Sequence, residues 1–102
     1  MLTSKQRAKL KSIGAKTDAL YQMGKNEADE NYIIQINTAL DAKELVKIKV
    51  LDNALYTPNE AAVNLAERTD SEVVQVIGSK FILYKKSRKP EKRELSKIIE
   101  NI

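Results

Sequence analysis

Residues 45–60, LVKIKVLDNALYTPNE, contain the two clearest structural signals of the chain. The first is an alternation of apolar and charged side chains over residues 45–51. Successive side chains of a strand point to opposite faces, so the branched apolar residues lie inward while Lys47 and Lys49 lie outward. This stretch therefore predicts a strand with one buried face and one exposed face.

The second signal is a helix start at Thr57. Proline follows as the first helical residue, and Glu60 stands three positions after the threonine. This order combines a capping box with a proline whose fixed backbone angle suits the first turn. It predicts a helix that runs to about Arg68.

The same rules place the other elements on either side of this stretch. Thr3 and Gln6 form a second capping box, Asp29 is suited to cap a helix, and Gly78-Ser79 is suited to a type II′ hairpin turn. Apolar residues at helical or alternating spacing complete the pattern. The expected helices cover residues 4–15, 30–43, 58–68 and 94–102, and the expected strands cover residues 19–23, 45–51, 73–77 and 81–84.

The order of these elements predicts the fold class. Helix, strand, helix, strand, helix, strand and strand are accounted for by a single α/β domain of the two-layer α+β type with a four-stranded mixed sheet. We expect residues 1–90 to form this domain and residues 91–102 to form a basic, amphipathic tail with a short helix. No repeat or linker divides the chain.

The composition weighs against an enzyme. The 102 residues include no cysteine and no histidine, which removes thiolate metal sites, disulfides and the commonest general base. No pair of carboxylates stands in an apolar setting that would separate their pKa values for acid–base work. We therefore expect no catalytic residue, metal, cofactor or small-molecule substrate. No apolar run is long enough for a signal peptide or a membrane span, which predicts a cytoplasmic protein without a membrane partner.

Charge is segregated along the chain, although the net charge is only +4. Residues 1–25 hold six Lys or Arg against Asp18 alone, residues 26–72 carry a net charge of −6, and residues 73–102 carry +5. Two basic ends that meet on one face would attract a polyanion. A single charge run is more often a solvated surface, but segregation at both ends favours nucleic acid as the partner.

Four groups of side chains are candidates for nucleic-acid contact. Lysines at helical spacing form a stripe on the first helix, and the exposed face of the strand at 45–51 adds two more. The basic stretch after residue 84 is the stronger candidate, because it is dense and has no carboxylate within it. Tyr84, at the end of a basic strand, is the best-placed ring for stacking on a base. The basic candidates are Lys5, Lys9 and Lys16; Lys47 and Lys49; and Lys85, Lys86, Arg88 and Lys89.

Several stretches together carry a family resemblance: LTSKQR at residues 2–7, GKN at 24–26, ELVKIKV at 44–50, and VQVIG at 74–78 leading to ILYK at 82–85. Over residues 2 to about 90 the chain resembles the stand-alone CRM domains of the YhbY-like family. The resemblance implies a fold similar to the C-terminal domain of translation initiation factor three. It also implies RNA binding and association with precursors of the large ribosomal subunit.

The resemblance extends to one loop. In that family a GxxG loop between the first strand and the second helix is a proposed RNA contact. Gly24, Lys25 and Asn26 match the motif, and Glu27 stands where the second glycine is expected. Glycine lets the backbone approach a phosphate, and a lysine beside helix-terminal amides attracts the anion. Glu27 adds a carboxylate and a Cβ at the proposed contact.

Three functions remain open at this point. The leading interpretation is a monomeric protein without catalytic activity that binds ribosomal RNA during assembly of the large subunit. A second is a protein-interaction module whose C-terminal apolar stripe docks into a partner's groove. That stripe consists of Leu95, Ile98, Ile99 and Ile102. A third, a nuclease or RNA-modifying enzyme, is disfavoured by the missing histidine and cysteine.

Overall fold

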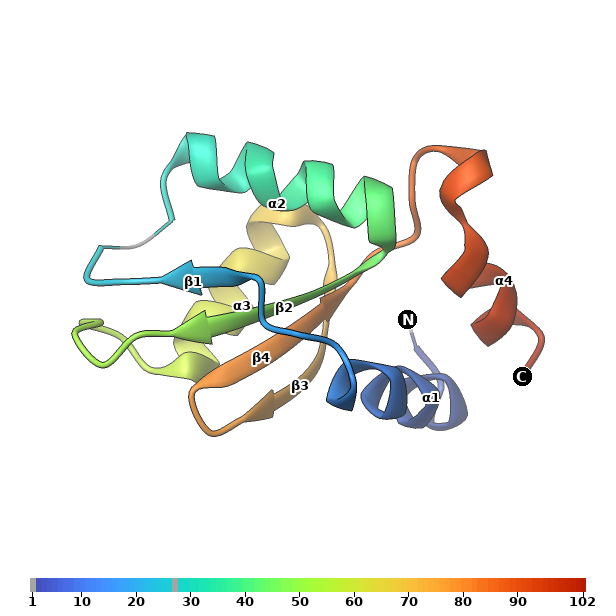
Figure 1. Cartoon of the computed structure of the whole chain (residues 1–102), viewed down its shortest axis with the longest axis horizontal. Coiled ribbons are helices and arrows are strands. Elements are labelled where there is room, and N and C mark those ends of the chain that lie inside the picture. Colours follow the sequence, from blue (N-terminus) through green and yellow to red (C-terminus); the bar gives the residue numbers. More distant parts are fainter. Residues whose placement is uncertain (1, 27) are drawn as a thin grey trace.

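The computed structural model describes residues 2–26 and 28–102, in which a mixed sheet carries helices on both faces (Figure 1). The helices are α1 (Ser4–Ala15), α2 (Glu30–Lys43), α3 (Pro58–Thr69) and α4 (Glu94–Glu100), and a 3-10 turn, η1, covers Pro90–Lys92. The strands are β1 (Tyr21–Met23), β2 (Leu45–Val50), β3 (Glu72–Ile77) and β4 (Lys80–Tyr84). Among these described helices, none combines the length and the apolar character needed to cross a membrane.

The sheet has the strand order β1-β2-β4-β3. β1 runs parallel to β2, whereas β2 and β3 each run antiparallel to β4. The predicted four-stranded mixed sheet is confirmed. β1 is shorter than the strand that we predicted over residues 19–23, because only Tyr21–Met23 pair with β2 and the Leu20 side chain is 77% exposed.

Local sequence signals set the helix starts as predicted. Thr3 and Thr57 each form a complete capping box with the residue three positions later. Asp29 caps α2, where its carboxylate accepts a hydrogen bond from the Tyr32 amide at 2.8 Å. Gly78 has a φ of 56°, the left-handed value that the first residue of a type II′ turn requires.

Two apolar clusters lie on opposite faces of the sheet. The larger cluster packs α2 and α3 against one face and includes Ile36, Leu65 and Phe81. The smaller cluster packs α1 and α4 against the other face and includes Leu10 and Ile99. α1 and α4 therefore add a partial third layer to the two layers that we expected.

α1 lies close against the sheet at Gly14. A Cβ on Gly14 would stand 2.5 Å from the Cδ1 atom of Ile82, so the absence of a side chain permits this approach. The Lys47 ammonium donates to the Gly14 carbonyl at 3.0 Å, at the helix end where a cation is favourable. α1 ends at Ala15, and the face of the sheet beyond it is uncovered (Figure 1). Cross-strand neighbours on that part of the face are exposed: Gln22, Lys49, Lys80 and Ile77.

The C-terminal segment belongs to the same folded unit. Ser96 and Ile99 of α4 are buried, and the Gln6 amide of α1 donates to the Ile99 carbonyl at 3.2 Å. Residues 91–102, which we expected to form a tail beyond the domain, contribute to the smaller apolar cluster. Ile98 and Ile102 remain exposed.

A buried carboxylate holds this segment in place. Glu44 is 0% exposed at the C-cap of α2, where its φ is 66°. Its carboxylate accepts hydrogen bonds from the Ser87 amide at 2.8 Å, from the Ser96 amide at 3.0 Å, and from the Ser96 hydroxyl. Arg93, the residue before α4, provides no side-chain cap. Glu44 therefore caps the first turn of α4 from a distant part of the chain.

Candidate nucleic-acid interface

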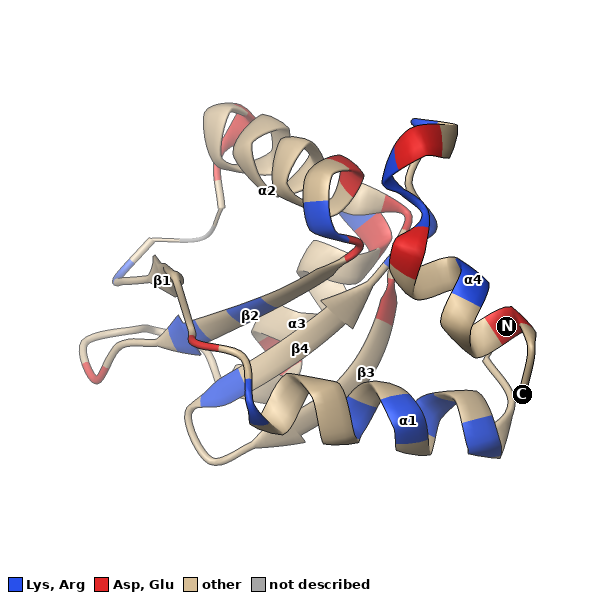
Figure 2. Ribbon diagram, turned by 45° about the vertical axis from the view of Figure 1, so that its right-hand side comes forward, with Lys and Arg blue, Asp and Glu red and all other residues tan. Residues whose placement is uncertain are grey.

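Lysines converge at the uncovered part of the sheet. Lys49 of β2 lies directly opposite Lys80 of β4, and Lys47 points to the same side, two positions earlier in β2. Lys16 caps the C-terminus of α1, next to the Gly14 carbonyl that binds the Lys47 ammonium. We call the set Lys16, Lys47, Lys49 and Lys80 the lysine face. Figure 2 shows the corresponding blue segments at the end of α1 and on β2 and β4.

The pairing of Lys49 with Lys80 is electrostatically unfavourable in the free protein. Like charges that stand directly opposite each other in an antiparallel pair repel and lower stability. Both side chains are exposed, and among the described residues neither forms an ion pair. A bound polyanion would relieve this repulsion.

Charge differs between α1 and the helices of the opposite face, α2 and α3 (Figure 2). α1 and its capping residues carry five cations and no carboxylate: Lys5, Arg7, Lys9, Lys11 and Lys16. α2 and α3 with their capping residues carry seven carboxylates against Lys43 and Arg68: Asp29, Glu30, Asp41, Glu44, Glu60, Glu67 and Asp70. α1 and the sheet face next to its C-terminal end therefore favour an anionic partner, whereas α4 on the same side carries carboxylates as well.

The predicted lysine stripe lies on the solvent side of α1. Lys5, Lys9 and Lys16 are all exposed. Arg7 turns toward the sheet instead, where its guanidinium donates to the carbonyls of Val73 and Val74. Lys16 belongs to both the stripe and the lysine face, so the two surfaces meet at the C-terminal end of α1.

Gly24, Lys25 and Asn26 lie in the loop between β1 and α2, and the last two are exposed. The Tyr56 hydroxyl lies 2.6 Å from the Gly24 carbonyl and 3.3 Å from the Asn26 carbonyl, which ties the loop to the chain that precedes α3. The Asp29 carboxylate accepts a hydrogen bond from the Tyr32 amide at the start of α2, which places a negative charge at that helix terminus. Glu27 lies outside the described residues, and its effect on the loop stays a prediction.

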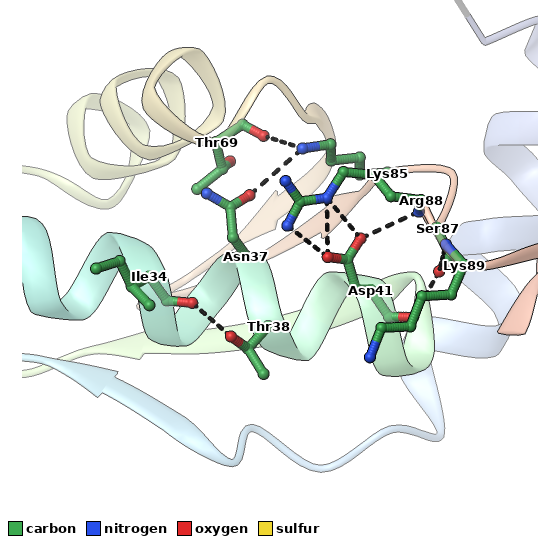
Figure 3. Close-up of polar contacts among 9 residues, drawn as sticks. All are labelled: Ile34, Asn37, Thr38, Asp41, Thr69, Lys85, Ser87, Arg88 and Lys89. Carbon is green, nitrogen blue, oxygen red and sulfur yellow. Dashed lines mark hydrogen bonds and ion pairs between the residues drawn. The ribbon is translucent and has the colours of Figure 1, made fainter.

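The basic cluster after β4 is largely paired within the chain (Figure 3). The Arg88 guanidinium holds the Asp41 carboxylate of α2 through two nitrogens, at 2.9 and 2.6 Å. The Lys85 ammonium donates to the Thr69 carbonyl at 2.9 Å. Lys86 forms an ion pair with Glu100 at 3.0 Å, and Lys89 is exposed. We expected a patch without carboxylates, but the fold brings acidic side chains to it from α2 and α4.

Tyr84 is not available to stack on a base. It is 7% exposed, its ring belongs to the smaller apolar cluster, and its hydroxyl shares a 2.6 Å hydrogen bond with the Ser96 hydroxyl. Burial raises the pKa of the Tyr84 phenol above its ordinary value of 10.0. The predicted stacking role is wrong, because α4 covers the face of β4 to which Tyr84 points.

The family model described as CRS1 / YhbY (CRM) domain matches residues 2–85. The chain belongs to the CRS1/YhbY (CRM) domain family. The resemblance that the sequence motifs indicated is confirmed.

Individual relatives match this CRM domain over most of their length. It is 39% identical over 95 residues to "Probable RNA-binding protein YqeI" of Bacillus subtilis, covering 93% of this chain and 99% of the relative. It is 29% identical over 91 residues to "Probable RNA-binding protein PA4753" of Pseudomonas aeruginosa, covering 89% and 88%. The solution structure of the hypothetical protein SAV1595 from Staphylococcus aureus superimposes with a TM-score of 0.74 at 41% identity, covering 92% of this chain and 98% of that one.

The lysine face of the CRM domain includes one residue that the sequence did not reveal. Lys80 stands alone in the sequence, between Ser79 and Phe81. Its importance comes from the register of β4 with β2, which places it opposite Lys49. The hairpin turn at Gly78-Ser79 locates Lys80 at a strand end, but nothing local predicts which strand lies beside it.

The ion pair between Arg88 and Asp41 gives a prediction about acid stability. The Arg88 side chain, hydrogen-bonded to the carboxylate, lowers the pKa of Asp41 below its ordinary value of 3.8. The contribution of this pair to the free energy of unfolding is therefore fully present above pH 3.8. It is lost as the pH falls through the lower pKa that Asp41 has in the folded state. We expect Arg88→Gln to destabilise the CRM domain near neutral pH and to have little effect in strong acid, as measured by urea unfolding. Lys89→Gln is the control, and an equal effect of Arg88→Gln at both pH values would exclude the ion pair as its cause.

Proposed function

We propose that this CRM domain binds RNA through the lysine face, and that its target is ribosomal RNA in precursors of the large ribosomal subunit. The observation that carries the proposal is the pairing of Lys49 with Lys80. These two exposed cations face each other, and neither forms an ion pair with a carboxylate of the described residues. The names of the YqeI and PA4753 relatives support RNA as the ligand. The sequence resemblance to YhbY-like proteins supports precursors of the large ribosomal subunit as the source of that RNA.

In this proposal the lysine face contacts phosphates, and the exposed lysines of α1 extend the contact along the RNA backbone. Phosphate contacts fix the position of a protein on a nucleic acid, while sequence preference needs further contacts to bases. The protein acts by binding and release, as a cytoplasmic monomer, and no covalent bond of the RNA changes.

The alternative of a protein-interaction module has weaker support. It requires the apolar stripe of α4 to be free for a partner's groove. Ile99 of that stripe is buried between α4 and α1, and only Ile98 and Ile102 are well exposed. The stripe is therefore used largely inside the domain.

RNA affinity should depend strongly on salt. Each phosphate contact contributes roughly 0.7 to 0.9 to the slope of log affinity against log salt, so the four residues of the lysine face alone predict a slope of about −3, and contacts by the α1 lysines make it steeper. The measurement is a titration of a structured fragment of large-subunit ribosomal RNA, followed by fluorescence anisotropy at several salt concentrations. An affinity that stays constant between about 50 and 200 mM salt would contradict phosphate binding.

The ribosomal part of the proposal has its own test. A cell extract sedimented through a sucrose gradient should show the protein in the fractions that hold large-subunit precursors. The Lys49→Gln/Lys80→Gln variant should move to the top of the gradient. If the unchanged protein also stays at the top while it binds RNA in vitro, RNA binding stands and the ribosomal target is wrong.

A further inference from the structure

A small hollow opens within the lysine face. It has a volume of about 170 Å³ and is lined by Lys47, Gln75, Ile77, Lys80 and Ile82. Ile82 is buried and forms the apolar floor of the hollow, whereas Ile77 is 55% exposed at the end of β3. None of the lining residues is acidic, and Lys49 stands beside the hollow, opposite Lys80.

Gln75 gives this hollow a neutral hydrogen-bonding group. It pairs with Ile82 in the register of β3 and β4 and is partly exposed. Within residues 2–26 and 28–102, no hydrogen bond engages its side-chain amide. A glutamine amide has both a donor and an acceptor, which is the combination that the edge of a nucleobase presents.

The combination of these groups favours one kind of occupant. A phosphate alone would use the lysines but would gain nothing from the exposed Ile77. In a duplex the base faces are stacked, and the deep groove of A-form RNA keeps side chains from the base edges. An unpaired nucleotide, in contrast, presents an apolar base face, a hydrogen-bonding edge and a phosphate at the same time.

We propose that this hollow binds one unpaired nucleotide of the RNA, with its base against Ile77, its edge hydrogen-bonded to Gln75 and its phosphates held by Lys49 and Lys80. The inference rests on the proposed RNA-binding function and narrows its substrate class to RNA with a bulge, loop or single-stranded segment. Ile77 and Gln75 are specificity-determining residues, and the lysines supply affinity.

The test compares two RNAs of equal length and charge, one fully paired and one with a bulged nucleotide, bound to the full chain. We expect the unchanged protein to prefer the bulged RNA by about tenfold, because base contacts add to the phosphate contacts. Gln75→Leu should weaken binding of the bulged RNA by about fivefold, as expected for one lost hydrogen bond, and should leave duplex binding unchanged. Ile77→Ser should have a similar effect through lost apolar contact.

Gln35→Leu is the matched control, because Gln35 is an exposed glutamine on α2, on the acidic side of the sheet. Equal binding of both RNAs, with Gln75→Leu and Ile77→Ser unchanged from the parent, would overturn the nucleotide site while the proposed function stands. Binding of neither RNA would overturn the proposed function and this inference together. Competition by a poly-aspartate peptide that matches competition by bulged RNA would show a general anion site and would also overturn the inference.

Discussion

Replacing Glu44 with alanine should lower the free energy of unfolding by about 3 to 5 kcal/mol. The change removes the acceptor for the buried amides of Ser87 and Ser96 and for the Ser96 hydroxyl. Each unsatisfied buried donor costs about 1 to 3 kcal/mol, and the first turn of α4 loses its cap. Urea unfolding followed by circular dichroism measures the effect.

Glu44→Gln is the matched control for this change. Alanine and glutamine share the cost of the left-handed backbone at this position, so their difference reports on the hydrogen bonds. Glutamine keeps one acceptor oxygen and the shape of the side chain, and its loss should be about half that of alanine. A loss below about 1 kcal/mol for alanine would show that α4 is held mainly by the apolar contacts of Ile99.

Neutralising Lys49 and Lys80 should weaken RNA binding by on the order of tenfold or more at low salt and lower the magnitude of the salt slope by about 1.4 to 1.8. The same double change to glutamine should leave the protein slightly more stable, by about 0.2 to 1 kcal/mol, because it removes like charges that face each other across two strands. Binding and stability therefore move in opposite directions. Anisotropy titrations and urea unfolding of one preparation measure both.

Lys86→Gln/Lys89→Gln is the control with the same change in net charge. From the sequence alone, the cluster at residues 85–89 is the stronger candidate for RNA contact. Our proposal places the lysine face first instead, because Asp41 and Glu100 already pair with Arg88 and Lys86. A larger loss of affinity in the control than in Lys49→Gln/Lys80→Gln would restore the original order and reject the lysine face.

The features that the sequence predicts correctly are those set by near neighbours. The capping boxes at Thr3 and Thr57 fix two helix starts through residues three positions apart. The alternation in β2 places Lys49 on the exposed side, as expected. These signals depend on local geometry, which the sequence contains in full.

The features that it misses depend on residues far apart in the chain. Arg88 meets Asp41 across 47 positions, and Ser96 meets Glu44 across 52. The sequence predicts that Tyr84 is exposed at the end of a basic strand, but α4 covers it, and Ser96 of α4 shares a hydrogen bond with its hydroxyl. Lys80 becomes part of a site only through the register of β4 with β2. No local spacing or turn in the sequence predicts these contacts.

Backbone amide shifts of isotope-labelled protein, recorded during a titration with bulged RNA, show directly which surface of the protein binds RNA. We expect the largest changes at the C-terminal end of α1, on β2 around Lys47 and Lys49, and on the β3–β4 hairpin from Gln75 to Lys80. The amides of α2 and α3 should change little, because their side of the sheet is acidic. Largest changes on α2 and α3 or in residues 85–93, with the lysine face unaffected, would contradict RNA binding by the lysine face.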